Sequence, residues 1–85
     1  MNYYKKTMQM TGKLSSRSVT FYYAVDRKNT VQVKHVKQTD EPSEYEVCTY
    51  KTKSEKLLSD ATEIHEVDFV KAIDRALAQI NKRIA

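Results

Sequence analysis

The first half of the chain alternates between apolar and polar residues with the period of two that is typical of half-buried β-strands. The alternation predicts strands at residues 2–11, 18–25, 30–37 and 45–51. In the strand at 18–25, β-branched and aromatic residues suit a pleated surface with one buried face. Its odd-numbered positions, which we expect to face the core, are Val19, Phe21, Tyr23 and Val25.

The other three strands divide in the same way into an inward and an outward set. The side chains expected to point inward are Tyr4, Met8 and Met10, then Val31 and Val33, then Tyr45, Val47 and Thr49. Val36 is out of phase with Val33, so either a bulge resets the register or Val36 lies on the outer face. Lys6 interrupts the inward face of the first strand, which is typical of an edge strand.

Polar segments separate the strands. The sequence from Asp26 to Asn29 predicts a short turn, and Pro42 marks a loop over residues 38–44. Residues 55–60, with Leu57 and Leu58, are interpreted either as a short fifth strand or as a turn that closes the core.

The C-terminal segment has the 3.6-residue period of an amphipathic helix, predicted over residues 66–84. Its apolar stripe consists of Phe69, Ile73, Ala76, Leu77, Ile80 and Ile84. With His65 as N-cap, Ile64 and Phe69 occupy the two positions of a hydrophobic staple. Glu66 and Asp68 lie in the first turn, where the helix dipole favours anions.

A sheet with one apolar face and a helix with one apolar stripe can cover each other. We therefore expect an α+β protein, a single domain over residues 1–85. Its small antiparallel, meander-like sheet of four or five strands would be covered on one face by the C-terminal amphipathic helix. A content of 40% hydrophobic and 31% charged residues agrees with a globular chain.

The composition excludes several classes of function. One Gly and one Pro in 85 residues leave no Gly-rich phosphate loop. No apolar run approaches the roughly 20 residues that span a bilayer, and residues 1–10 lack the continuous apolar segment of a signal peptide. We therefore expect a cytoplasmic protein without a membrane partner. The net charge of +4 mildly favours polyanionic partners.

Catalytic and metal-binding patterns are also missing from the sequence. Cys48 would need a neighbouring histidine base to act as a nucleophile, and His35 could reach it only if their strands pair suitably. His35 and His65 belong to different predicted elements, whereas a metal site needs three or four convergent ligands. The sequence therefore predicts a non-enzymatic protein with no catalytic residues, no metal and no other cofactor.

The outward-pointing side chains of the predicted sheet form the candidate binding surface. They are Tyr3, Lys5, Tyr22, Gln32, Lys34 and Tyr50. Exposed aromatic rings can stack on unpaired bases and lysines attract phosphates, so single-stranded nucleic acid is one candidate ligand. Cations at strand ends and in loops would extend the positive field: Arg17, Arg27, Lys28, Lys51 and Lys53. Glu44 and Glu46, expected on the same face, would oppose it.

The main functional prediction is a small protein-interaction module. An exposed edge of the first strand could pair with a strand of a partner or of a second copy. Tyrosines are also enriched at protein interfaces, and dimerisation helps to stabilise a chain of this size. We therefore expect binding to a protein partner or homodimerisation, with single-stranded nucleic-acid binding as the alternative. The expected element order resembles that of several small single-stranded DNA-binding folds, a likeness of order alone.

Overall fold

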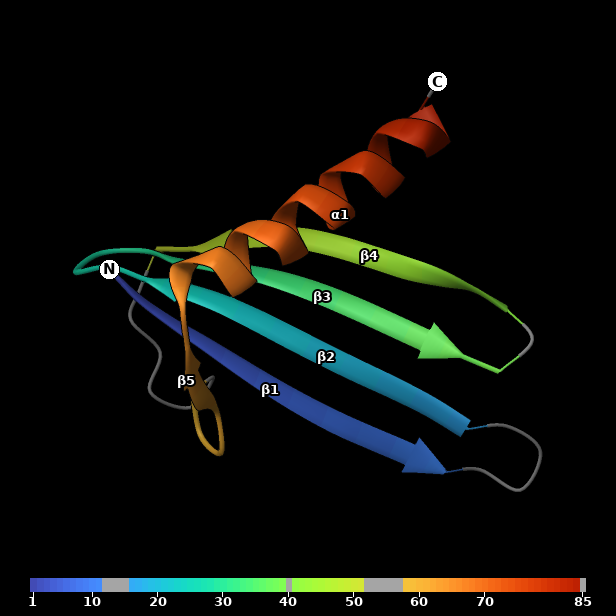
Figure 1. Ribbon diagram of the computed structural model, residues 1–85, viewed down its shortest axis with the longest axis horizontal. Coiled ribbons are helices and arrows are strands. Elements are labelled where there is room, and N and C mark those ends of the chain that lie inside the picture. The colour runs from blue at the N-terminus through green and yellow to red at the C-terminus, as the bar shows by residue number, and fades with distance from the viewer. Residues whose placement is uncertain (12–15, 40, 52–57, 85) are drawn as a thin grey trace.

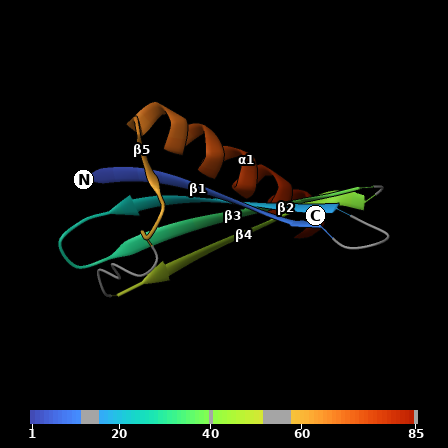
Figure 2. The ribbon, with the colours of Figure 1, turned by 90° about the horizontal axis from the view of Figure 1, so that it is seen from below.

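Six elements follow one another in the computed structural model, which describes residues 1–11, 16–39, 41–51 and 58–84. They are β1 (Asn2–Thr11), β2 (Ser16–Val25), β3 (Thr30–Gln38), β4 (Glu41–Tyr50), β5 (Thr62–Ile64) and α1 (Glu66–Ile84). The strands form one five-stranded antiparallel sheet in the order β4-β3-β2-β1-β5, and α1 lies across one face of it (Figures 1 and 2). The predicted α+β fold, an antiparallel sheet with a C-terminal helix, is confirmed.

Local signals explain where α1 begins. The backbone carbonyl of His65 accepts hydrogen bonds from the N–H groups of Asp68 (3.1 Å) and Phe69 (3.4 Å), so His65 holds the N-cap position. Ile64 packs against the same core cluster as Phe69, as a hydrophobic staple requires. Glu66 and Asp68 place two carboxylates in the first turn, at the positive end of the helix dipole.

The core lies between α1 and the middle of the sheet. It is formed by the buried side chains of Ala24, Val33, Phe69 and Ala76. Ala76 is 0% exposed, so its small side chain lets the helix approach the sheet closely. Leu77, expected in the buried stripe, is instead 45% exposed. Leu77 therefore lies at the exposed rim of the stripe, next to the fully buried Ala76.

The turn between β2 and β3 determines which side chains share a face of the sheet. Asp26 Oδ1 accepts the backbone N–H groups of Lys28 (2.7 Å) and Asn29 (2.6 Å), and Asp26 N–H donates to the Asn29 carbonyl (3.0 Å). The loop sets Val25 opposite Thr30. Even-numbered residues of β2 therefore share a face with odd-numbered residues of β3.

This register corrects the predicted faces of β1 and β2. The face under α1, here called the helix face, carries Tyr3, Lys5, Thr7, Thr20, Tyr22, Ala24, Val31, Val33, His35, Tyr45 and Val47. The opposite face, here called the open face, carries Tyr4, Lys6, Met8, Val19, Phe21, Tyr23, Gln32, Lys34, Val36, Glu44, Glu46 and Cys48. The inward set predicted for β2 thus points away from α1, whereas the inward sets of β3 and β4 are correct. The alternation marks two sets of side chains, but the turn decides which set faces the helix.

The structure also settles two details of β3 and β4. Val36 pairs with Val19 and Glu44 and lies on the open face, the second of its two predicted positions. A register irregularity follows between Val36 and Gln38. Pro42, expected in a loop, lies inside β4, which begins at Glu41. An edge strand tolerates a proline because its outer N–H groups need no partner strand.

The fifth strand is β5, and it lies later in the chain than expected. Leu58–Asp60 forms a turn in which the Ala61 N–H donates to the Leu58 carbonyl (3.0 Å). The rest of the predicted stretch, residues 55–57, lies outside the described residues. β5 pairs with β1 over Tyr3–Lys5, so β1 is an edge strand only beyond Lys5.

Candidate functional site

The structure divides the six predicted binding residues between the two faces of the sheet. Tyr3, Lys5 and Tyr22 lie on the helix face. Gln32, Lys34 and Tyr50 lie on the open side. The six residues therefore do not form one surface. The prediction placed Tyr22 of β2 on the same face as Gln32 and Lys34 of β3, but Tyr22 pairs with Val33 and so lies on the other face.

The three residues on the helix face contact α1 or each other. The Tyr3 ring packs against Phe69, with 5.4 Å between ring centroids, and this contact makes Tyr3 a core residue. The Lys5 ammonium lies 5.7 Å from the centroid of the Tyr22 ring, within range of a cation–π interaction. Lys5 and Tyr22 also line a hollow of about 340 Å³ beside the helix.

The three residues on the open side differ in exposure. Gln32 is only 6% exposed, and its Nε2 donates to Cys48 Sγ at 3.5 Å. Lys34 is half-buried and pairs in register with Glu46. Tyr50 is 39% exposed at the end of β4. Burial raises the pKa of the neighbouring Tyr23 hydroxyl, and Tyr50 and Cys48 raise it further, so this end of the face is poorly solvated.

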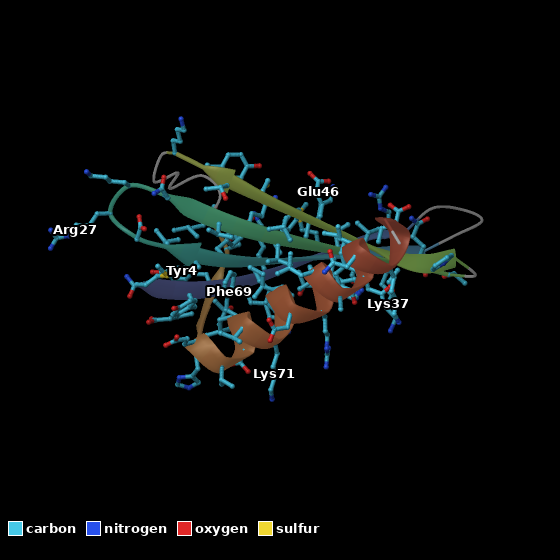
Figure 3. The ribbon with its side chains drawn as sticks, turned by 90° about the horizontal axis from the view of Figure 1, so that it is seen from above. Tyr4, Arg27, Lys37, Glu46, Phe69 and Lys71 are labelled. Atoms are coloured by element: carbon cyan, nitrogen blue, oxygen red, sulfur yellow. The ribbon has the colours of Figure 1, made fainter. Side chains whose placement is uncertain are left out.

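The cations expected to extend the positive field lie apart from one another. Arg27 and Lys28 are exposed in the β2–β3 turn, Lys51 is exposed just after β4, and Arg17 is exposed near the start of β2. Figure 3 shows Arg27 pointing outward at one end of the sheet. Lys53 lies outside the described residues.

Cys48 and His35 are on opposite faces of the sheet, because Cys48 pairs with Gln32 and His35 with Tyr45. The thiol–imidazole pair considered from the sequence therefore does not form. The His35 ring stacks on Tyr45, with 4.4 Å between centroids and 5° between planes. Burial lowers the pKa of His35, and the positive charges of Lys37 and Arg75 lower it further.

The open face is ordered in rows that cross the sheet from β1 to β4. One row consists of Lys6, Phe21, Lys34 and Glu46. The next row consists of Met8, Val19, Val36 and Glu44. The face thus carries Lys6 and Met8 at β1, Glu44 and Glu46 at the β4 edge, and between them three apolar side chains and a second cation, Lys34. Figure 3 shows Glu46 pointing away from the side on which Lys71 of α1 projects.

The shape of the open face also differs between its β1 edge and its β4 edge. Met8 is 41% exposed near the β1 edge, whereas Val19 and Val36 between the edges are each 4% exposed. Toward β4 the surface is hollowed by about 160 Å³. This hollow is lined by Arg17, Lys34, Val36, Glu44, Tyr45 and Glu46. A protruding apolar side chain and a hollow therefore lie toward opposite edges of one face.

Sequence reasoning missed Lys6, Met8 and Glu46 as surface residues that belong together. Lys6 was interpreted as an inward charge of an edge strand, and Met8 as a core residue. The available signal was the spacing of two between Lys6 and Met8 and between Glu44 and Glu46. This spacing becomes informative only when the strand register is known, because the register aligns Lys6 with Glu46 and Met8 with Glu44 across the sheet.

Comparison of the chain with protein-family models, with curated proteins and with solved structures found no significant match. Among the described residues, no group of three or more His, Cys, Asp or Glu side chains could hold a metal ion. The described helix, Glu66–Ile84, lacks the apolar length needed to cross a membrane.

Proposed function

We propose that the chain is a non-enzymatic interaction module that forms a homodimer through the open face. The observation that carries the proposal is the row formed by Lys6, Phe21, Lys34 and Glu46. Its two ends have opposite charges, so the row is complementary to a second copy of itself. The lone Cys48 agrees with a reducing compartment, and we place the module in the cytoplasm.

Symmetry specifies how two copies would meet. Most homodimers have a twofold axis, so the same patch serves on both sides and residue i contacts residue j twice. A twofold axis parallel to the strands and midway between β2 and β3 places β1 of one copy over β4 of the other. Lys6 then faces Glu46 of the second copy, twice in each dimer. Lys34 faces the Phe21 ring, which suits a cation–π contact.

The neighbouring row, which begins with Met8, adds shape complementarity between the two copies. With the same axis, Met8 faces the β4 side of the second copy, where Val36, Glu44 and Glu46 line the 160 Å³ hollow. An unbranched methionine side chain adapts readily to such an irregular gap. Val19 of one copy lies opposite Val36 of the other, but each is only 4% exposed in a single chain, so Met8 would supply most of the apolar contact.

The area of the face is sufficient for a reversible dimer. Four strands spaced about 4.8 Å apart, each about ten residues long at roughly 3.3 Å per residue, span a face of about 600 Å². Two copies would then bury about 1,200 Å², the lower end of the range for specific interfaces. Sheets packed in this way lie with their strands about 30° apart.

Sedimentation velocity over a range of protein concentrations tests the proposal. We expect the mass to rise from one to two chains with concentration, and Met8→Asp to hold the protein as a monomer. Val70→Asp is the matched control, because Val70 is 42% exposed on α1, away from the open face. A monomer at all concentrations, or a dimer that Val70→Asp abolishes and Met8→Asp does not, would overturn it.

A further inference from the structure

A second surface lies on the other side of the sheet, where α1 leaves part of the helix face uncovered. The helix starts beside β5 and crosses the sheet obliquely toward β4, so the far ends of β1, β2 and β3 are not beneath it (Figure 1). Polar side chains occupy this uncovered part. They are Thr7, Gln9, Ser18, Thr20 and Lys37.

One flank of α1 forms a wall beside this area. Asp68, Lys71 and Arg75 are spaced i, i+3 and i+7, which puts them on one side of a helix. They line the 340 Å³ hollow together with Lys5 and Tyr22 of the sheet. Lys71 of α1 and Lys37 of β3 project on the same side of the molecule (Figure 3). Helix and sheet therefore combine to make a groove that neither forms alone.

The charge of this groove is not neutralised from within. Lys5, Lys71 and Arg75 line the hollow with one carboxylate, Asp68, and in the described part of the chain none of these cations forms an ion pair with it. Burial and the positive charges of Lys37 and Arg75 lower the pKa of His35 on the same face.

A second, separate hollow lies farther along the sheet. A narrow gap of about 20 Å³, lined in part by Tyr22, His35 and Arg75, adjoins the first hollow. The second hollow, of about 290 Å³, is at the far end of the strands, where Gln9, Ser18 and Lys37 line it from the helix face and Arg17 lines it from the open side. Lys5 and Gln9 are four residues apart on β1, so the two hollows are separated by roughly 13 Å.

We infer that this basic groove binds the sugar–phosphate backbone of single-stranded nucleic acid over about two or three nucleotides. Positively charged grooves that follow a backbone are a general means of holding single strands. Hydroxyl and amide groups such as those of Thr7, Thr20 and Gln9 are frequent partners of phosphate oxygens and sugars. Lys5 covers Tyr22 and His35 stacks on Tyr45, so few aromatic faces are left for bases. Binding should therefore be independent of sequence.

A nucleic-acid strand fits the groove better than an acidic peptide does. An extended peptide docks through alternate side chains that enter pockets and through main-chain pairing with a sheet edge. The groove lies on the face of the sheet, and polar side chains form most of its lining. The part of the groove beside α1, lined by Lys5, Lys71 and Arg75, is on the opposite side from the open face, so it stays accessible in the proposed dimer and either proposal can fail without the other.

Fluorescence anisotropy of a labelled single-stranded oligonucleotide of mixed sequence, titrated with the full chain at several salt concentrations, tests the inference. Two or three neutralised phosphates predict a slope of log K against log salt of about −1.4 to −2. Lys71→Gln and Arg75→Gln should each weaken binding about threefold to tenfold and make the slope shallower by about 0.7. Arg27→Gln and Lys28→Gln in the β2–β3 turn remove the same charge elsewhere and should change affinity less than twofold.

Three results would overturn the inference. The first is an absence of binding at low salt, where electrostatic attraction is strongest. The second is an equal loss of affinity in the groove variants and in the two control variants, which would indicate attraction to net charge alone. The third is tighter binding of polyglutamate than of the oligonucleotide at the same ionic strength, which would make the ligand an acidic peptide. Unfolding midpoints of all variants, measured in parallel, verify that each remains folded.

Discussion

The Asp26 carboxylate accepts the backbone N–H of Asn29 at 2.6 Å, and this contact closes the loop between β2 and β3. The same oxygen accepts the N–H of Lys28 at 2.7 Å. Because the loop sets Val25 opposite Thr30, it also decides which side chains lie under the helix and which on the open face. One exposed aspartate thus contributes to the placement of both proposed binding surfaces.

Replacing Asp26 should destabilise the protein in a pH-dependent way. The two backbone hydrogen bonds lower the pKa of Asp26 below its ordinary value of 3.8. The stabilisation is therefore fully present above that value and is lost as the pH falls through the lowered pKa. We expect Asp26→Ala to lower the urea midpoint at pH 7. The difference from the parent protein should shrink below about pH 4.

Asp26→Asn is the control, because its amide oxygen can still accept both N–H groups. It should retain more of the stability at pH 7 than Asp26→Ala does. Equal urea midpoints for the parent protein and Asp26→Ala at pH 7 would show that the loop does not depend on this side chain.

His35 should make the fold sensitive to mild acid. Its pKa lies below the ordinary 6.5 because of burial and of the charges of Lys37 on its own strand and Arg75 on α1, while Tyr45 of β4 stacks on the ring. The unfolded chain therefore takes up a proton more readily than the folded one. Stability should be full above about pH 6.5 and fall as the pH drops toward the lowered pKa.

A series of unfolding curves between pH 7.5 and about pH 5 measures this effect. His35→Phe keeps an aromatic ring on Tyr45 and should remove the His35 part of the slope. A slope that survives in His35→Phe would assign the acid sensitivity to another group.

Because α1 approaches the sheet closely at Ala76, the stability of the fold should depend strongly on the size of the side chain at this position. Ala76 is 0% exposed and packs with Phe69, Ala24 and Val33. Ala76→Leu forces extra volume into this contact and should lower the free energy of unfolding by about 1–3 kcal/mol. Ala78→Leu, on the exposed side of the same helix, should change it by less than about 0.5 kcal/mol. Equal effects in guanidinium titrations would contradict the packing described.

The sequence predicts the elements of this fold better than it predicts their faces. The helix follows from a 3.6-residue period and from signals at its own N-terminus, around Ile64 and His65, which are local. The face that β2 turns to the helix depends on pairing with β3, which a period of two within one strand leaves undetermined. The exposure of Leu77 also depends on tertiary packing, because the period of the helix marks an apolar stripe but not which of its residues contact the sheet.

The candidate surfaces, like the faces of the strands, depend on strand pairing that local sequence patterns do not determine. The basic flank of the helix, with Lys71 and Arg75 at i and i+4, is visible in the sequence. Its partner Lys5 could be assigned to the groove only once β1 was placed on the helix face. The row from Lys6 to Glu46 needs three strand pairings at once, so no local pattern reveals it.

A mixing experiment with charge-reversed variants tests the proposed dimer most directly. In Lys6→Glu, residue 6 and Glu46 of the second copy would repel each other twice in every dimer, and in Glu46→Lys the two lysines would do the same. Each variant alone should therefore dimerise roughly tenfold or more weakly than the parent chain. Mixed in equal amounts, they should form a heterodimer in which both pairs attract.

Sedimentation equilibrium of each variant and of the mixture, at the concentration where the parent protein is dimeric, is the measurement. Monomeric single variants and a dimeric mixture are the result that a self-complementary open face predicts. A mixture as monomeric as its components, or variants that dimerise as well as the parent, would show that Lys6 and Glu46 do not meet across an interface.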